Sequence, residues 1–83
     1  MLSILVAGHV YTLGESSAAE LVGRAPGPLA DKLRDAIHAH EPEQLDDGEL
    51  ATLGTVIEAW ATELGVDAAD VQELREAIAD HLG

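Results

Sequence analysis

Hydrophobic side chains recur every three or four positions through the second half of the chain, which is the period of an amphipathic helix. This period predicts one helix over residues 48–64, preceded by Asp46 and Asp47 as candidate N-cap residues. It predicts a second helix over residues 68–82, and Gly65 between them indicates that the two fold back on each other as an αα-hairpin. Their apolar stripes are expected to form the main core or a subunit interface. The residues of these stripes are Leu50, Leu53, Ile57, Trp60, Leu64, Val71, Leu74 and Ile78.

The same period continues, over shorter stretches, in the first half of the chain. Residues 28–40 are predicted to form a helix that starts with Pro28 in its first turn. Ser17 and Glu20 have the spacing of a capping box, which predicts a short helix ending at Gly23. The prolines and glycine between these two helices predict a tight connection that sets the angle between them.

Residues 1–13 carry two conflicting patterns. A helical face would be formed by Leu2, Leu5, Val6, His9 and Leu13. High strand propensity is contributed by Ile4, Val6, Val10, Tyr11 and Thr12. A lone strand in a helical chain would need a partner from another subunit, so we favour a helix over a strand for this segment. The predicted fold is an all-α bundle of four or five short helices that forms a single domain over residues 1–83.

The composition bears on partners rather than on fold. The chain has 83 residues and no cysteine, so its core is small and has no disulfide to stabilise it. This favours association, and we expect a homo-oligomer such as a homodimer, or a complex with another protein. Sixteen acidic residues against four basic ones give a formal charge of -12, which repels phosphate and disfavours nucleic acid as a partner. Two explanations of the acidity stay open, namely halophilic adaptation and the base composition of the genome.

Two patterns nevertheless resemble DNA-binding helix pairs. Ala61, Gly65 and Val71 have the internal spacing of a helix-turn-helix. Residues 14–21, followed by residues 28–40, resemble the second and third helices of winged-helix regulators. Acidic residues dominate the outward positions of the supposed recognition helix, where they would repel the DNA backbone. Under this alternative the chain is a small transcriptional regulator whose candidate nucleic-acid contacts are Arg24, Lys32 and Arg34.

The residues that carry chemistry do not form a recognisable site in the sequence. His9, His38, His40 and His81 lack the spacing of a metal motif, so we expect no metal ligands. The chain has no cysteine and no glycine-rich phosphate loop, and we expect neither an enzyme nor a cofactor. No stretch is apolar enough to span a bilayer, and the N-terminus lacks the basic region of a signal peptide. We therefore expect a cytoplasmic, non-catalytic, acidic helical protein-interaction module with no membrane partner.

Overall fold

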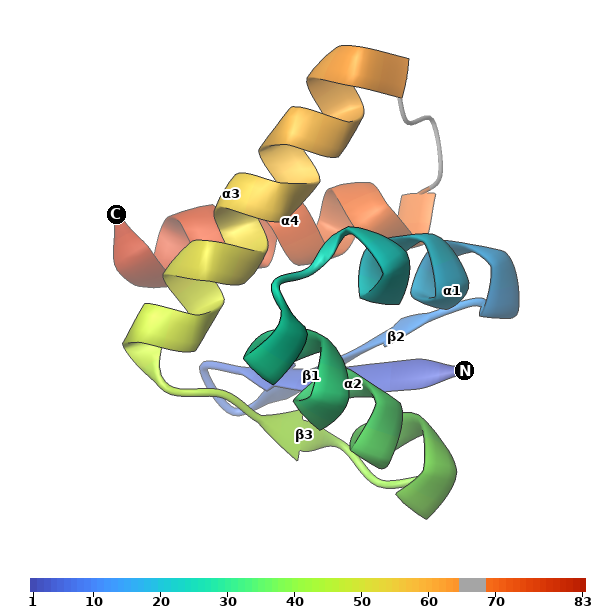
Figure 1. Ribbon diagram of the computed structural model, residues 1–83. Helices are drawn as coiled ribbons and strands as arrows, with labels where there is room; N and C mark the ends of the chain where they lie inside the picture. Colours follow the sequence, from blue (N-terminus) through green and yellow to red (C-terminus); the bar gives the residue numbers. More distant parts are fainter. Residues whose placement is uncertain (65–68) are drawn as a thin grey trace.

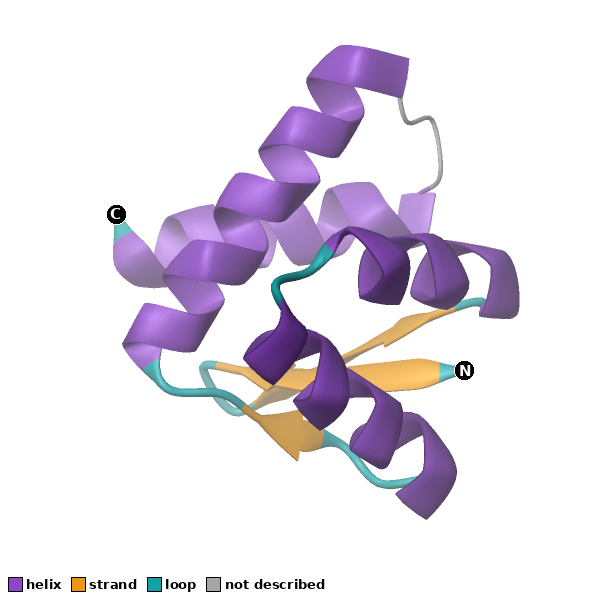
Figure 2. Ribbon diagram, in the orientation of Figure 1, coloured by secondary structure: helices purple, strands orange, loops and turns teal. Residues whose placement is uncertain are grey.

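The computed structural model describes residues 1–64 and 69–83, and it shows a mixed α/β fold (Figure 1). The described residues form the strands β1 (Leu2–Val6), β2 (His9–Leu13) and β3 (Glu43–Gln44). They form the helices α1 (Glu15–Arg24), α2 (Gly27–Ala39), α3 (Asp47–Leu64) and α4 (Ala69–Leu82). Figure 2 shows the helices grouped on one side of the sheet. The predicted all-α bundle is therefore wrong, because residues 2–13 provide two strands and Glu43–Gln44 a third.

The segment 1–13, for which we favoured a helix, is a β-hairpin. β1 pairs antiparallel with β2, and Ala7 and Gly8 form the turn between the strands. Both turn residues have positive φ, 51° for Ala7 and 82° for Gly8, as a two-residue type I′ turn requires. The partner that a strand needs is thus supplied by the same segment. The assumption that this segment holds one element was the source of the error.

The third strand completes a sheet with the order β2-β1-β3. β3 runs parallel to β1, with Ile4 beside Glu43 and Leu5 beside Gln44. A parallel partner needs a crossover connection, and here α1 and α2 lie between the hairpin and β3 in the sequence. β1 is therefore the central strand, with one neighbour close in sequence and one distant.

The helices from residue 27 onward match their predicted bounds to within one residue. α2, α3 and α4 correspond to the segments predicted at 28–40, 48–64 and 68–82. The predicted capping box of Ser17 and Glu20 is wrong, because α1 begins at Glu15 after Gly14. The turn proposed at Gly65, and with it the centre of the helix-turn-helix pattern, lies outside the described residues.

One hydrophobic core lies between the helices and the sheet. Leu2, Ile4 and Val6 of β1 are at most 1% exposed and contribute to the same cluster as the helical side chains. Seven residues of the predicted apolar stripes are buried there, and the side chain of the eighth, Leu64, lies outside the described part. The seven are Leu50, Leu53, Ile57, Trp60, Val71, Leu74 and Ile78.

Candidate functional site

The two faces of the sheet differ sharply in burial. Along β1, Leu2, Ile4 and Val6 point toward the helices and are buried, whereas Ser3 and Leu5 between them are only half-buried. Alternate residues of a strand point to opposite faces, so Ser3 and Leu5 belong to the face away from the helices. We call this side of the sheet the open face. Its members, set by the strand register, are Ser3, Leu5, Val10, Thr12 and Gln44.

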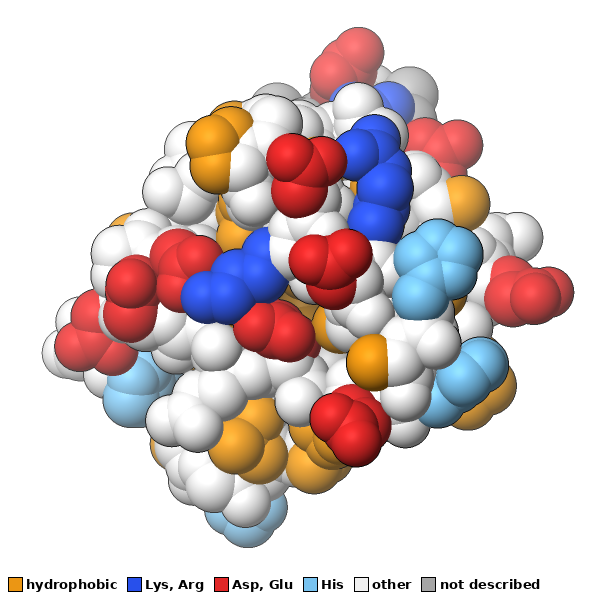
Figure 3. Space-filling model, turned by 60° about the horizontal axis from the view of Figure 1, so that its bottom comes forward, with side chains coloured by type: hydrophobic (Ala, Val, Ile, Leu, Met, Phe, Trp, Pro, Cys, Tyr) orange, Lys and Arg blue, Asp and Glu red, His pale blue; other side chains and the backbone are white. Residues whose placement is uncertain are grey.

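The open face is uncharged, although the chain as a whole carries a formal charge of -12. Ser3 and Thr12 lie directly opposite each other, and their hydroxyl oxygens are 3.0 Å apart, at hydrogen-bonding distance. Leu5 lies opposite Val10, which is 52% exposed and is one of the most exposed large hydrophobic residues described. In the lower part of Figure 3, hydrophobic and other uncharged side chains surround an acidic side chain, below a cluster of acidic and basic groups. The open face is therefore a neutral area on a strongly acidic molecule.

β2 forms one border of the sheet, and its outer side pairs with no other described strand. A two-residue hairpin turn makes Val6 and His9 a hydrogen-bonded pair, and the pattern alternates from there. The backbone N–H and C=O groups of His9 and Tyr11 consequently point toward β1. Those of Val10 and Thr12 point away from it. We call these outward backbone groups of Val10 and Thr12 the free edge.

The free edge ends at Gly14, where the fold provides a partner for the next outward group. The backbone N–H of Gly14 donates to Oδ2 of Asp70, at 2.9 Å, and Asp70 stands at the start of α4. Oδ1 of the same carboxylate accepts a bond from the N–H of Val71 at 2.9 Å and lies 3.5 Å from the Ser17 hydroxyl. The bond from Gly14, aided by that from Val71, lowers the pKa of Asp70 below its ordinary value. Asp70 thus engages the outward N–H of Gly14 and leaves the outward backbone groups of Val10 and Thr12 open.

A shallow groove of about 510 Å³ adjoins the open face at the hairpin turn. Its apolar lining comes from Leu5, Leu45 and Leu50, and its polar lining includes Asp47 and His81. The nearest oxygen of Asp47 is 3.0 Å from Nε2 of His81, so the start of α3 contacts the end of α4 across this groove. The groove extends the exposed apolar surface around Leu5 toward the helices.

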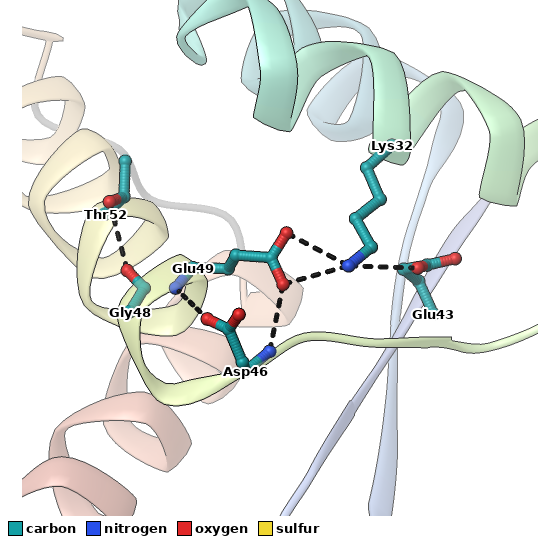
Figure 4. Close-up of polar contacts among 6 residues, drawn as sticks. All are labelled: Lys32, Glu43, Asp46, Gly48, Glu49 and Thr52. Carbon is teal, nitrogen blue, oxygen red and sulfur yellow. Dashed lines mark hydrogen bonds and ion pairs between the residues drawn. The ribbon is translucent and has the colours of Figure 1, made fainter.

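The only lysine of the chain, Lys32, joins three elements through carboxylates (Figure 4). Its Nζ on α2 lies 2.9 and 3.0 Å from the two oxygens of Glu49 on α3, and 3.9 Å from Glu43 on β3. Glu49 also accepts from the N–H of Asp46 at 3.1 Å, and Asp46 accepts from the N–H of Glu49 at 2.7 Å. This reciprocal pair is a capping box, as expected for an N-cap residue at Asp46. The cluster is a structural clamp, because each of its members is already engaged.

The electrostatics of the clamp reinforce its geometry. The hydrogen bond to Glu49 is the largest influence on Lys32, and it raises the pKa of the lysine. The same bond, together with the N–H of Asp46, lowers the pKa of Glu49. Both groups are held in their charged forms, so neither is suited to act as a proton donor or acceptor near neutral pH.

The other two candidate nucleic-acid contacts are also paired with carboxylates. Nη1 of Arg24 lies 3.3 Å from Oε2 of Glu63, and Nε of Arg24 lies 3.5 Å from Oε2 of Glu20. The guanidinium carbon of Arg24 is 5.7 Å from the centre of the Trp60 ring. Arg34 lies 3.0 Å from Asp31 on the same helix. Lys32 and Arg34 are two residues apart on α2, so they project from different sides of it. The three cationic side chains are thus distributed among separate ion pairs rather than joined in one basic surface.

Within residues 1–64 and 69–83, no group of three or more His, Asp or Glu side chains is arranged to hold a metal ion. In the same part of the chain, no helix combines the length and the hydrophobicity needed to cross a membrane. Sequence patterns alone do not single out Val10, Thr12 and Asp70. The alternation of Leu2, Ile4 and Val6 was the available signal for the first two.

Comparison with other proteins does not extend this description. The chain matches no protein-family model, no curated protein and no solved structure.

Proposed function

We propose that this chain is a non-catalytic protein-interaction domain that self-associates along β2, the strand that carries the free edge and part of the open face. The observation that carries the proposal is the contrast between the neutral open face and the acidic remainder of the molecule. Two copies with a formal charge of -12 each repel one another over most of their surfaces. Contact between them is least costly where carboxylates are absent, and the open face is such an area.

The small size of the domain supports the same proposal. A chain of 83 residues without a disulfide has a modest core, and burying further apolar area in a dimer adds to its stability. Val10 is half exposed, and Leu5 is half-buried beside it. Association along β2 would shield part of the Val10 side chain from water.

The DNA-binding alternative lacks a comparable observation. Arg24, Lys32 and Arg34 each make ion pairs with carboxylates of the same chain. Binding a phosphate backbone would require breaking these pairs and approaching the surrounding acidic groups. A regulator would bind random duplex DNA with an affinity that falls as salt rises, and we expect no binding at any salt concentration.

The proposal is tested by light scattering over a range of protein concentrations. We expect a mass of twice 8.7 kDa for the native chain at micromolar concentration. Val10→Glu places a charge on the open face, and we expect it to shift the mass toward that of the monomer. Ala19→Glu is the matched control, because Ala19 is an exposed residue of α1 and the substitution adds the same charge. A native chain that stays monomeric in both low and high salt would refute the proposal.

A further inference from the structure

We infer that two copies of this chain pair through β2, antiparallel about a twofold axis at Tyr11, with Val10 of one copy opposite Thr12 of the other. The inference rests on the proposed self-association and names its contact. The pairing would join two three-stranded sheets into one continuous sheet with β2 strands at its centre. The occupant of the free edge is thus a second copy of the same strand.

The composition of β2 is the first argument for this contact. Monomeric proteins protect exposed strand edges with charged side chains, prolines, bulges or a covering element. β2 has the sequence His-Val-Tyr-Thr-Leu, without an acidic residue, a lysine or a proline, in a chain of which 24% is charged. α4 packs against the hairpin, with its buried side chains in the same core as Leu13. The side chains of Val10 and Thr12, on the open face, are exposed.

The hydrogen bond between Gly14 and Asp70 is the second argument, because it limits which registers are open. An antiparallel pair centred on Thr12 would place Val10 opposite Gly14 of the second copy. The N–H of Gly14 already donates to Asp70, at 2.9 Å, so that pairing would break an existing bond.

A pair centred on Val10 is excluded by the turn. It would place Thr12 opposite Gly8 of the second copy, and Gly8 has a φ of 82° in the type I′ turn. A residue in that conformation does not continue the extended backbone of a strand. The only residues of the two strands that could then exchange backbone hydrogen bonds would be Val10 and its counterpart in the second copy.

Centring the pair on Tyr11 satisfies every group of the free edge. Val10 then lies opposite Thr12 of the second copy on both sides of the axis, and each such pair exchanges two hydrogen bonds. Tyr11 meets its own counterpart at the axis as a non-hydrogen-bonded pair. This register uses both open positions of each β2 and leaves the bond from Gly14 to Asp70 intact.

Cross-linking tests the register directly, because the chain has no cysteine of its own. The Cα atoms of a non-hydrogen-bonded antiparallel pair are about 4.5 Å apart, within the range that a disulfide spans. Tyr11→Cys should therefore form a disulfide-linked dimer on mild oxidation. Ala19→Cys, on the exposed side of α1, is the control for random collision. Because Tyr11 is half-buried, circular dichroism must first show that the variant is folded.

A second measurement avoids substituting Tyr11. Val10→Cys and Thr12→Cys chains, mixed in equal amounts and oxidised, should give the mixed disulfide in excess of the half that random pairing produces. In addition, Thr12→Pro removes one outward N–H and the hydroxyl contact with Ser3 but keeps the backbone hydrogen bonds between β1 and β2, and it should weaken association at least tenfold.

The outcomes separate the two proposals. The β2 pairing is overturned, while self-association stands, if the native chain has a dimeric mass but two results fail. Tyr11→Cys would then cross-link no faster than Ala19→Cys, and the mixed disulfide would be no more abundant than random pairing produces. Homodisulfides of Val10→Cys or of Thr12→Cys in excess overturn the register in the same way. A monomeric native chain overturns both.

Discussion

The carboxylate of Asp70 accepts a hydrogen bond from the backbone N–H of Gly14, with 2.9 Å between oxygen and nitrogen, and so ties the start of α4 to the end of β2. Asp70→Ala would leave this N–H without its partner and remove the bond to Val71. We expect a loss of about 1–2 kcal/mol in the free energy of unfolding, measured by denaturant titration. Asp80→Ala, at an exposed position of α4, is the control and should change little. Equal losses for the two variants would contradict the role of the bond.

Lowering the pH should test the same contact through the pKa of the Asp70 carboxyl group. The pKa of Asp70 is lowered in the folded chain, so its contribution to stability is present above the pKa of the unfolded state and is lost as pH falls through the folded value. That window lies below about pH 4. Asp70→Asn keeps an acceptor oxygen but does not titrate. Its unfolding free energy should therefore fall less steeply than that of the native chain below about pH 4, and identical slopes would contradict the assignment.

The clamp around Lys32 predicts a second, independent effect. Lys32→Met would leave Glu49 and Glu43 facing each other without the cation between them. The stability of the chain should fall, and by more than in Arg34→Met, whose ion pair with Asp31 is exposed within one helix. Thermal unfolding compares the two variants. Glu49→Gln combined with Lys32→Met should be less destabilising than the sum of the two single changes, because the two side chains share one interaction.

The hairpin turn holds a residue in a conformation that its side chain disfavours. Ala7 has a φ of 51°, and asparagine accepts this region more readily than alanine, above all before glycine in a type I′ turn. Ala7→Asn should therefore raise the free energy of unfolding by about 0.5–1 kcal/mol. The same substitution in a helix, Ala19→Asn, should lower it, since asparagine is a poorer helix former than alanine. A loss of stability in Ala7→Asn would show that the turn differs from the one described.

The same turn shows why the strands escaped prediction. In sequences, two-residue hairpin turns are recognised by Asn-Gly or Asp-Gly, and Ala7-Gly8 offers only half of that signal. Without a turn, residues 1–13 form one element in the prediction, and a single strand there would lack a partner, which favours a helix. β3 is two polar residues long and carries no pattern from which it could be predicted. Its position depends on contacts distant in sequence.

The helices α2, α3 and α4 were predictable because each buries a stripe that repeats with the helical period. The open face could not be predicted in the same way, since its membership depends on strand register and on which face the helices cover. Asp70 illustrates the point further. Its carboxylate stands at the start of α4, and the bond to Gly14 could be found only in three dimensions.

Trp60 provides a spectroscopic test of the core, because it is the only tryptophan of the chain and is 6% exposed. Its emission should be blue-shifted in the folded chain relative to free tryptophan in water. Trp60→Ala should cost about 3–5 kcal/mol, measured by circular dichroism during denaturation, because a large buried side chain leaves a cavity. Trp60→Phe, which retains part of the ring volume, should cost less. An emission maximum equal to that of free tryptophan would contradict the burial.

Salt should stabilise the chain. Sixteen acidic residues and four basic ones are brought closer together on folding, so repulsion is stronger in the folded state than in the unfolded state. The Debye length shrinks from about 10 Å at 0.1 M salt to about 3 Å at 1 M, and the largest gain should fall within this range. The surface ion pairs weaken as well, but they contribute little. A midpoint of thermal unfolding that stays constant or falls between about 0.05 and 2 M NaCl would contradict the repulsion argument.

The central position of β1 has a consequence for the order of folding. Its antiparallel neighbour follows after a two-residue turn, and hairpins of this kind form within about 1–10 μs. Its parallel neighbour requires Ile4 to meet Glu43, which means closing a loop that contains β2, α1 and α2. The entropy of that closure must be offset before the contact is formed, and such distant pairings slow folding. We expect the hairpin to form early and the docking of β3 to limit the rate at which the chain reaches its final structure.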